Sequence, residues 1–364
     1  MTPIVPPATI GVLGGGQLGR YTVVAARLMG YGTVVLDPDR AAPAGAVADV
    51  HVVAPYDDPG ALDRLAERCA VVTTEFENPP AEALERLAAD VVVAPPPRAV
   101  AIAQDRVAEK SFLRERGVPT APWSTGEPVG YPAIVKTARL GYDGKGQAAV
   151  ADDAELADAL DALAVPCVVE RRVPLDVELS VLVARTADGR DVTYPVAENA
   201  HADGILDVTV APARVDHRVA EEAQVLARRI AAALDYVGVL AVELFVSDGL
   251  LLVNELAPRP HNSGHWTLDA SATSQFEQHV RAICGLALGA TDLVGGPTVA
   301  MANLLGDRWA AGTPAWGQAL ADPAAHLHLY GKRDARPGRK MGHLTVVGDD
   351  AAARVVALRD ALTR

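Results

Sequence analysis

The sequence predicts an α/β protein whose N-terminal part is built around a parallel β-sheet. Half of the residues are hydrophobic, and glycine and proline occur along the whole chain, which is typical of a globular protein. Over residues 1–100, short apolar runs alternate with segments of helical spacing, as in a parallel sheet covered on both faces. The predicted strands there are 10–13, 33–36, 50–54, 71–74 and 91–94, and the predicted helices are 17–29, 62–68 and 81–88.

The later elements follow from the same kinds of pattern. The triple proline 95–97 ends the first pattern, because proline fits neither a helix interior nor a central strand, and we place a domain boundary there. Beyond it we expect helices at 104–116, 153–163 and 219–234 and strands at 133–136, 167–170, 177–184, 239–246 and 250–255. The last part of the chain predicts short strands and a terminal helix at 351–362, in a small separate lobe.

Composition excludes several classes of function. A chain of 364 residues is too long for one ordinary core, so two or three domains are expected. The net charge of −13 argues against nucleic-acid binding, which needs a large basic surface. Cys69, Cys167 and Cys284 form no metal-binding or disulfide pattern. The N-terminus lacks the features of a signal peptide, and no run reaches the roughly 20 apolar residues of a membrane span. We therefore expect a cytoplasmic protein without nucleic-acid or membrane partners.

A GxGxxG motif at 14–19 lies between a predicted strand and a predicted helix. Its glycines let a phosphate approach the backbone, and the helix N-terminus provides N–H groups and a positive dipole end. Asp37, at the end of the second strand, resembles the acid that binds the ribose of NAD. Taken alone, the motif favours a dinucleotide, with a purely structural turn as the second interpretation. It favours a phosphate near Gln17 and Leu18.

The second motif is Lys136, at the end of a strand, followed by the glycine-rich segment 141–146 with the sequence GYDGKG. A lysine on a strand can pair with nucleotide phosphates, and a glycine loop can close over them with its backbone N–H groups. The segment is not a Walker A sequence. A solvent-exposed turn that contains a lysine explains it equally well.

The third feature is a pair of acids, Glu243 and Glu255, each of which interrupts an apolar predicted strand. Neighbouring antiparallel strands could place both carboxylates on one face, close to Asn254. Such acids are costly to bury unless they meet water, cations or a metal. Two carboxylates together with phosphate oxygens are a normal set of Mg²⁺ ligands. Structural salt bridges, for example with Arg259, are the alternative.

Two polar segments follow the acids. Arg259, His261, Asn262 and His265 crowd one irregular stretch, which we interpret as a segment that orients a substrate; it lacks the spacing of a zinc site. Residues 330–340 carry five firm cations, which could bind a phosphate monoester. Charged runs are more often solvated surface loops, and this remains the alternative.

At this point the sequence resembles a known family, the N5-carboxyaminoimidazole ribonucleotide synthetases, which are ATP-grasp enzymes of purine synthesis. The motifs that carry the resemblance are GGGQLGR at 14–20, TEFEN at 74–78, GYDGKGQ at 141–147, NELAPRPHNSGHWT at 254–267 and RPGRKMGH at 336–343. The resemblance implies an ATP-grasp fold with a Rossmann-like parallel-sheet domain at 1–100, an ATP-grasp domain at 101–296 with a mobile lid at about 120–178, and a small, mostly β C-terminal domain at 297–364.

The resemblance also implies ligands and roles. The substrates would be ATP, bicarbonate and 5-aminoimidazole ribonucleotide, with Mg²⁺ as the metal, in a homodimer. Magnesium would be held by Glu243 and Glu255, and the catalytic residues would be Lys136, Arg259 and His261. Nucleotide contacts would come from Arg106, Lys136, Gly141, Tyr142, Asp143, Gly144, Lys145, Gly146, Gln147, Glu170, Arg171, Arg172, Val173, Glu178, His201, Asn254 and Glu255. Ribonucleotide contacts would come from Gln17, Leu18, Glu75, Tyr142, Lys145, Asn262, Lys332, Arg339 and Lys340.

Three alternative functions stay open at the level of sequence. A ligase of the same fold that uses formate on glycinamide ribonucleotide is the nearest rival, and an NAD-dependent oxidoreductase is a more remote one. A non-catalytic nucleotide sensor is a third. The sequence also leaves open whether Glu75 or Glu77 faces the ribonucleotide.

Overall fold

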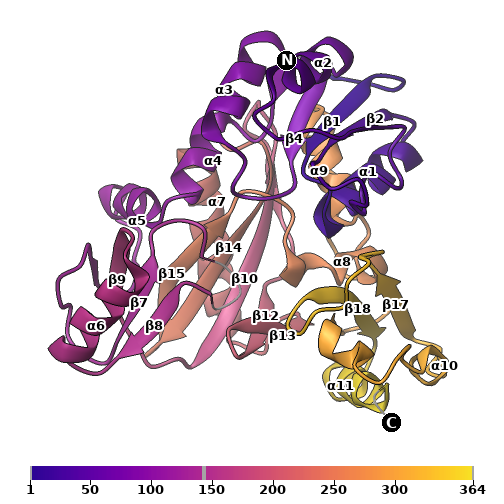
Figure 1. Ribbon diagram of the computed structural model, residues 1–364. Helices are drawn as coiled ribbons and strands as arrows, with labels where there is room; N and C mark the ends of the chain where they lie inside the picture. The colour runs from indigo at the N-terminus through magenta and orange to yellow at the C-terminus, as the bar shows by residue number, and fades with distance from the viewer. Residues whose placement is uncertain (1, 142–144, 363–364) are drawn as a thin grey trace.

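The computed structural model describes residues 2–141 and 145–362, and in this part of the chain three β-sheets form. The N-terminal sheet has five parallel strands in the order β3-β2-β1-β4-β5 (Figure 1). Its strands are β1 (Thr9–Leu13), β2 (Gly32–Leu36), β3 (Val50–Val52), β4 (Val71–Thr74) and β5 (Val92–Val93). The predicted parallel sheet is confirmed.

Helices cover both faces of this sheet because its strands are apolar on both sides. On one face, α2 (Pro59–Arg68) and α3 (Ala81–Asp90) pack their leucines against the strands. On the other lie α1 (Gln17–Leu28) and α9 (Gln275–Ile283), which comes from much later in the chain (Figure 1). The shared core around α9 ties the N-terminal sheet to the rest of the molecule.

The triple proline ends the N-terminal sheet but does not interrupt regular structure for long. Pro97 is the first residue of a helix, α4 (Pro97–Ala103), which the sequence analysis did not predict. Proline is tolerated at the first helical position because its missing N–H has no partner within the helix there. The next helix, α5 (Arg106–Glu115), lies within the range 104–116 where one helix was expected.

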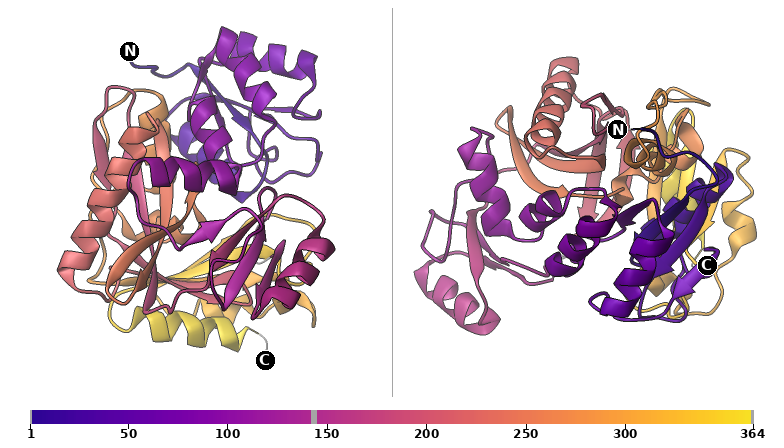
Figure 2. Two further views of the ribbon diagram at one scale, coloured as in Figure 1. Left: turned by 90° about the vertical axis from the view of Figure 1, so that its left-hand side faces the viewer. Right: turned by 90° about the horizontal axis from the view of Figure 1, so that it is seen from above.

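A small antiparallel sheet has the order β6-β9-β7-β8 and packs on one helix, α6 (Asp153–Leu163). Its strands are β6 (Trp123–Ser124), β7 (Ala133–Thr137), β8 (Gln147–Val150) and β9 (Cys167–Arg171). It lies apart from the N-terminal sheet in both views of Figure 2. This arrangement fits the lid subdomain expected at about 120–178.

The large sheet has nine strands, ordered β15-β14-β10-β12-β13-β16-β18-β17 with β11 beside β10. One face of its first strands is covered by α7 (His217–Ala233), over a core rich in Val, Leu and Ala. The strands from the central region are β10 (Val177–Arg185), β11 (Asp191–Thr193), β12 (Ala197–Ala202), β13 (Ile205–Ala211), β14 (Gly238–Ser247) and β15 (Leu250–Ala257).

The C-terminal strands extend this same sheet. β16 (Val299–Leu305) pairs with β13, and β18 (Lys340–Val347) pairs with β16 and with β17 (Ala325–Leu329). The expected small lobe is therefore joined to the central sheet by backbone hydrogen bonds, with α11 (Ala351–Ala361) packed on it. The remaining elements are η1 (Asn262–Gly264), α8 (Thr267–Ala270), η2 (Gly306–Trp309) and α10 (Trp316–Ala319). Within the described residues, the helices are all too short or too polar to cross a membrane.

Candidate active site

Glu243 on β14 and Glu255 on β15 lie directly opposite each other in the antiparallel pairing of these strands. A β-bulge between Glu243 and Leu244 shifts the register next to the pair. Because residues that are paired across two strands share a face of the sheet, the two carboxylates converge. This is the geometry that the sequence predicts for the acids.

The electrostatics of the pair fit a divalent cation. Burial, reinforced by the negative charge of Glu255, raises the pKa of Glu243 to about 7. Burial also acts to raise the pKa of Glu255, but Arg106 outweighs it and brings that pKa below its usual value, with Nη1 2.8 Å from Oε2. Of these two half-buried carboxylates, Glu255 therefore has a close guanidinium, whereas Glu243 has none within ion-pair distance among the described residues. Oxygen ligands with excess negative charge are what Mg²⁺ prefers.

Lys136 on β7 and Lys110 on α5 approach Glu170 from two sides. The Lys136 Nζ lies 3.1 Å from Glu170 Oε2 and 3.3 Å from the side-chain oxygen of Asn254. The Lys110 Nζ lies 3.2 Å from Glu170 Oε1 and is fully buried. Burial lowers the pKa of Lys136 despite Glu170. Lys110 was not among the predicted site residues. It follows Arg106 by four positions on α5, so that both cations lie on the same side of this helix.

The glycine segment begins and ends beside Thr137 and Arg106. Arg106 Nη2 lies 3.5 Å from the carbonyl oxygen of Gly141, and the Thr137 N–H donates to the carbonyl of Gly146 at 2.8 Å. Gln147 is exposed and pairs with Lys136 in the register of β7 and β8. Lys145 is exposed as well. Tyr142, Asp143 and Gly144 lie outside the described residues.

Arg171 is the last residue of β9, and Arg172 and Val173 follow it before β10; the two arginine side chains are exposed and Val173 is half-buried. Their backbone is fixed, because the N–H of Arg171 donates to Pro122 and that of Arg172 to Pro132. Farther on, His201 Nδ1 on β12 lies 2.7 Å from Glu178 Oε2 on β10. Glu178 and His201 lie near the carboxylate pair, because β10 pairs with β14, the strand that carries Glu243.

Arg259 and His261 lie in the loop after β15 and each contacts an acid. Arg259 Nε lies 2.5 Å from Glu77 Oε2, and His261 Nε2 lies 3.2 Å from Glu243 Oε1. Burial would raise the pKa of Glu77, yet the Arg259 guanidinium outweighs it and holds the pKa below its usual value. Burial lowers the pKa of His261 far below its ordinary value, so the imidazole is neutral.

The side chains of Asn262 and His265, from the same loop, are buried beneath it and hold it in place. Asn262 is buried, and its amide nitrogen donates to Asn303 at 3.0 Å. His265 is fully buried, with Nδ1 3.3 Å from the amide nitrogen of Gln275. Asn262 Oδ1 has no hydrogen-bond partner among the described residues. Neither side chain is open to solvent.

The N-terminal glycine motif is filled by acids of this chain. Glu75 accepts from the N–H groups of Gly16 at 2.8 Å and Gly19 at 3.0 Å, at the start of α1. Asp37 accepts from Gly15 N–H at 2.6 Å and from the Tyr56 hydroxyl at 2.7 Å. The helix N-terminus that would bind the pyrophosphate of NAD therefore holds the Glu75 carboxylate, and Asp37, the acid placed to bind the ribose, is bonded to Gly15 and Tyr56 instead. This geometry disfavours the oxidoreductase.

Glu75, rather than Glu77, lies at the helix N-terminus, and burial raises its pKa against the opposing charges of Arg259 and Lys332. Gln17 begins α1 and is half-buried, whereas the Leu18 side chain packs in the hydrophobic core. The sequence analysis left the choice between the two acids open, because alternation along a short segment does not fix their direction.

The basic segment reaches the same region. Lys332 Nζ donates to the Lys340 carbonyl at 2.8 Å, and Arg339 Nη1 donates to the Asp334 carbonyl at 3.0 Å. The positive charge of Lys340 acts to lower the pKa of both Glu243 and His261, although burial keeps the pKa of Glu243 above its usual value. Lys332 and Lys340 thus lie close enough to bring positive charge to Glu75 and to the carboxylate pair.

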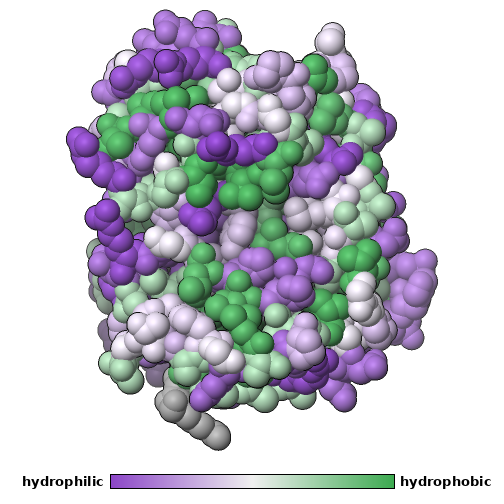
Figure 3. Space-filling model, turned by 90° about the vertical axis from the view of Figure 1, so that its right-hand side faces the viewer, coloured by the Kyte–Doolittle hydropathy of each residue, from purple (hydrophilic) through white to green (hydrophobic). Residues whose placement is uncertain are grey.

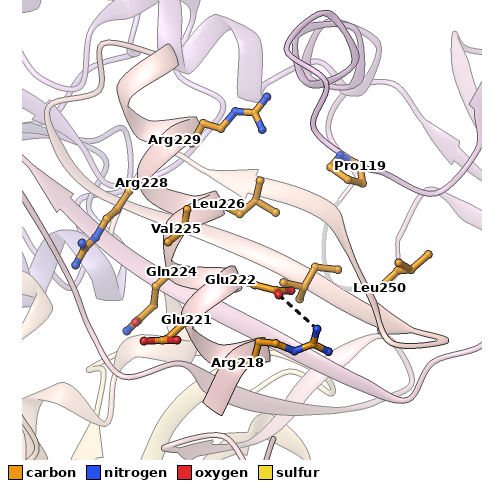
Figure 4. Close-up of a pocket in the computed structure, with 11 residues that line it drawn as sticks. Pro119, Arg218, Glu221, Glu222, Gln224, Val225, Leu226, Arg228, Arg229 and Leu250 are labelled. Atoms are coloured by element: carbon orange, nitrogen blue, oxygen red, sulfur yellow. Dashed lines mark ion pairs between the residues drawn. The ribbon is translucent and has the colours of Figure 1, made fainter. Parts of the chain in front are cut away.

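A separate groove of about 820 Å³ runs along α7 (Figure 4). Its lining includes Leu226 on the helix and Leu250 on the β14–β15 hairpin, and an ion pair joins Arg218 to Glu222. The predicted site residues are absent from this lining. We therefore place the site at the carboxylate pair and not in this groove.

Three family models match the chain. The ribonucleotide synthetase preATP-grasp domain matches residues 7–104, the ATP-grasp domain matches 114–276, and the phosphoribosylaminoimidazole carboxylase C-terminal domain matches 299–355. The first covers the N-terminal sheet, the second covers the small sheet and strands β10 to β15 of the large sheet, and the third covers β16 to β18.

Similar proteins agree with these matches. The N5-carboxyaminoimidazole ribonucleotide synthase of Brucella melitensis is 47% identical over 358 residues, covering 94% of this chain and 97% of the relative. That of Bacillus subtilis is 43% identical, covering 94% and 92%. A crystal structure of an ADP complex of such a synthetase has a TM-score of 0.93 at 40% identity and full coverage of both chains. The Aspergillus clavatus enzyme in complex with ADP and 5-aminoimidazole ribonucleotide has a TM-score of 0.88 at 34% identity, covering 98% of each chain. The chain therefore belongs to the N5-carboxyaminoimidazole ribonucleotide synthase family of ATP-grasp ligases.

Proposed function

We propose that this protein uses ATP and bicarbonate to carboxylate 5-aminoimidazole ribonucleotide to N5-carboxyaminoimidazole ribonucleotide, in purine biosynthesis. The observation that carries the proposal is the paired carboxylates Glu243 and Glu255, with Arg106 on one side and His261 on the other. A relative of the same family was crystallised with ADP and the same ribonucleotide, which supports the choice of substrates.

ATP would lie between the small sheet and the large sheet. Lys136, with Lys110 behind it, would face the phosphates, and Arg106 would reach them from α5. The segment 141–147 would cover them, and residues 170–173 with Glu178 and His201 would border the rest of the nucleotide. Glu243 and Glu255 would hold Mg²⁺, which would supply charge neutralisation at the terminal phosphates.

The other two substrates would meet on the side of the N-terminal sheet. Arg259 and His261 would bind bicarbonate. The ribonucleotide would contact Gln17 and Glu75, with its phosphate at the basic residues Lys332, Arg339 and Lys340. Asn262, which the sequence predicted as a contact, has a buried side chain bonded to Asn303 and would support the loop instead. The charge that Lys332 and Arg259 place near Glu75 supports this location. The backbone rather than the core-packed side chain of Leu18 would face the ligand.

In the first step a bicarbonate oxygen attacks the γ-phosphorus of ATP, forming a P–O bond and releasing ADP, which leaves carboxyphosphate. Lys136 and Arg106 offset the charge that gathers on the transferred group. In the second step carboxyphosphate breaks down to phosphate and CO2, and the exocyclic amine of the ribonucleotide takes up the carbon. Carboxyphosphate is short-lived in water, so closure over the site should come before it forms.

We further propose a division into domains at 1–100, 101–296 and 297–364, and a homodimer. The face shown in Figure 3 has hydrophobic patches between hydrophilic ones, and Leu28 on α1, Leu320 after α10 and Leu329 on β17 are exposed. Apolar surface of this kind can serve a subunit contact, which light scattering would test. The cytoplasmic location stays a prediction.

The decisive experiment is a phosphate-release assay with each substrate omitted in turn. Phosphate release that needs ATP, bicarbonate and 5-aminoimidazole ribonucleotide together supports the proposal. Release with formate and glycinamide ribonucleotide would favour the rival ligase. Phosphate release that continues without the ribonucleotide would show a bicarbonate-dependent ATPase instead, and no release at all would favour the sensor. A rise in melting temperature with MgATP but not with NAD adds a check on the nucleotide.

A further inference from the structure

The ring of His261 is held in one tautomer by its own loop. His261 precedes the short helix η1, and its Nδ1 lies 3.3 Å from the backbone nitrogen of Ser263 and 2.8 Å from the Ser263 hydroxyl. A backbone N–H can only donate, so Nδ1 must offer a lone pair. The proton of the ring is therefore on Nε2, which faces Glu243 Oε1 at 3.2 Å.

The hydroxyl of Ser263 is itself in contact with a second hydroxyl, that of Ser180. Ser180 lies on β10 opposite Glu243 in the strand register, and its Oγ lies 2.8 Å from that of Ser263. Both serines are 1% exposed, so water cannot replace either partner. When Ser180 donates to Ser263, the hydrogen of Ser263 is directed to His261 Nδ1. The three side chains form one chain of hydrogen bonds that ends at the carboxylate pair.

The backbone of His261 is fixed as firmly as its ring. Gln275 Oε1 accepts from the His261 N–H at 2.8 Å, and Gln275 Nε2 donates to the His261 carbonyl at 2.7 Å. This pair of bonds also fixes the direction of the Gln275 amide. The ring cannot turn over without breaking the bond between Ser263 and Nδ1.

We propose that Ser263, supported by Ser180, is a positioning residue that keeps His261 in the Nε2–H form. This N–H faces Glu243 in the structure and donates to bicarbonate once bicarbonate takes the place of Glu243 as its acceptor, so that the ring presents a donor rather than a base. The part of this inference that concerns bicarbonate rests on the proposed function. An anion beside Arg259 is bound by a further N–H and repelled by a nitrogen lone pair, so the tautomer decides whether His261 helps or hinders binding. Residues that orient a histidine through its other ring nitrogen act in this way at many sites.

The test compares Ser263→Ala and Ser180→Ala with the control Thr22→Val, which removes a buried hydroxyl bonded only within α1. The first readout is the pair of ¹⁵N shifts of His261 in histidine-labelled protein, identified by the loss of its signals in His261→Gln. We expect Nε2–H in the wild type and the control. Ser263→Ala removes the 2.8 Å hydroxyl contact and leaves only the longer backbone N–H, 3.3 Å from Nδ1, so a measurable share of the Nδ1–H form should appear in this variant. Ser180→Ala, which leaves the Ser263 donor in place, should show a smaller change.

The second readout is steady-state kinetics. In Ser263→Ala the KM for bicarbonate should rise about tenfold, as expected for a lost hydrogen bond to a charged group, while the KM for ATP and for the ribonucleotide should change less than twofold. Unchanged ¹⁵N shifts and an unchanged bicarbonate KM in a folded Ser263→Ala protein would overturn the inference. The two failures are separable, because wild-type protein that does not use bicarbonate refutes the proposed function while the ¹⁵N shifts still report on the tautomer.

Discussion

Glu109 allows a quantitative test of the charge balance beneath the site. It lies on α5, is 2% exposed, and accepts the N–H of Leu256 at 3.2 Å, one residue after Glu255. Burial, only partly opposed by Lys110, raises its pKa from 4.5 to about 8. Between these two pH values the folded protein binds a proton that the unfolded chain has lost. Stability from this group is therefore complete below pH 4.5 and is lost as the pH rises towards 8.

The substitution Glu109→Gln keeps an oxygen acceptor for Leu256 and removes the titration. One pKa unit corresponds to about 1.4 kcal/mol, so the wild type should lose about 2 kcal/mol by pH 6 and about 4 kcal/mol by pH 8, a loss that the variant avoids. The assay is urea unfolding of both proteins from pH 5 to 8, with Glu85→Gln on the exposed side of α3 as a control. Parallel stability curves for wild type and Glu109→Gln would refute the reasoning, since they would show that Glu109 is ionised at no cost in the fold.

Three further predictions concern the site itself. Glu255→Gln should reduce turnover at least a hundredfold, because it would remove a proposed magnesium ligand; the melting temperature should change little, because the lost pair with Arg106 is offset by the end of the repulsion between Glu255 and Glu243, and wild-type kcat would contradict the metal role. Glu77→Gln should cost about 3–5 kcal/mol in urea unfolding, because it leaves Arg259 buried without its carboxylate, and a cost below 1 kcal/mol would show that water compensates it. Lys340→Ala should raise the KM for the ribonucleotide about tenfold with kcat nearly unchanged, whereas an unchanged KM would make the basic segment a plain surface loop.

Periodicity predicted the parallel N-terminal sheet and many of the later helices and strands, whereas the ATP-grasp fold was implied by the family resemblance. Alternating apolar runs located the five strands of the N-terminal sheet, and the acids in two apolar strands predicted that Glu243 and Glu255 would meet. Helix α4 was not predicted, because the prolines at 95–97 argue against a helix. Proline breaks a helix in its interior but is compatible with its first position, where Pro97 lies. The joining of β16 to β13 could not be predicted, since strand pairing between distant segments leaves no mark on either one.

Within the site, the chain's motifs located the acids and cations but not their partners. That Arg259 would contact Glu77, and Lys110 would contact Glu170, depends on packing between segments far apart in the sequence. Ser180 carried no signal, because single serines in a strand are common, and Ser263 stood out only as part of the 254–267 motif, with no role of its own. The glycine motif was misleading taken alone, since a carboxylate of this chain, Glu75, takes the place where a phosphate would be expected.

The two arginine ion pairs of the site join different parts of the fold. Arg106 on α5 contacts Glu255 on the large sheet, and Arg259 after β15 contacts Glu77, which follows β4 of the N-terminal sheet. Each guanidinium is thereby held in one position by an acid that its own segment does not carry. Buried pairs add little net stability but fix geometry, and cations that are fixed beforehand need no reordering when charge develops on a transferred phosphoryl group. If the proposed roles of Arg106 and Arg259 hold, the packing of the N-terminal sheet on the large sheet, through the α1–α9 core, serves catalysis as well as folding.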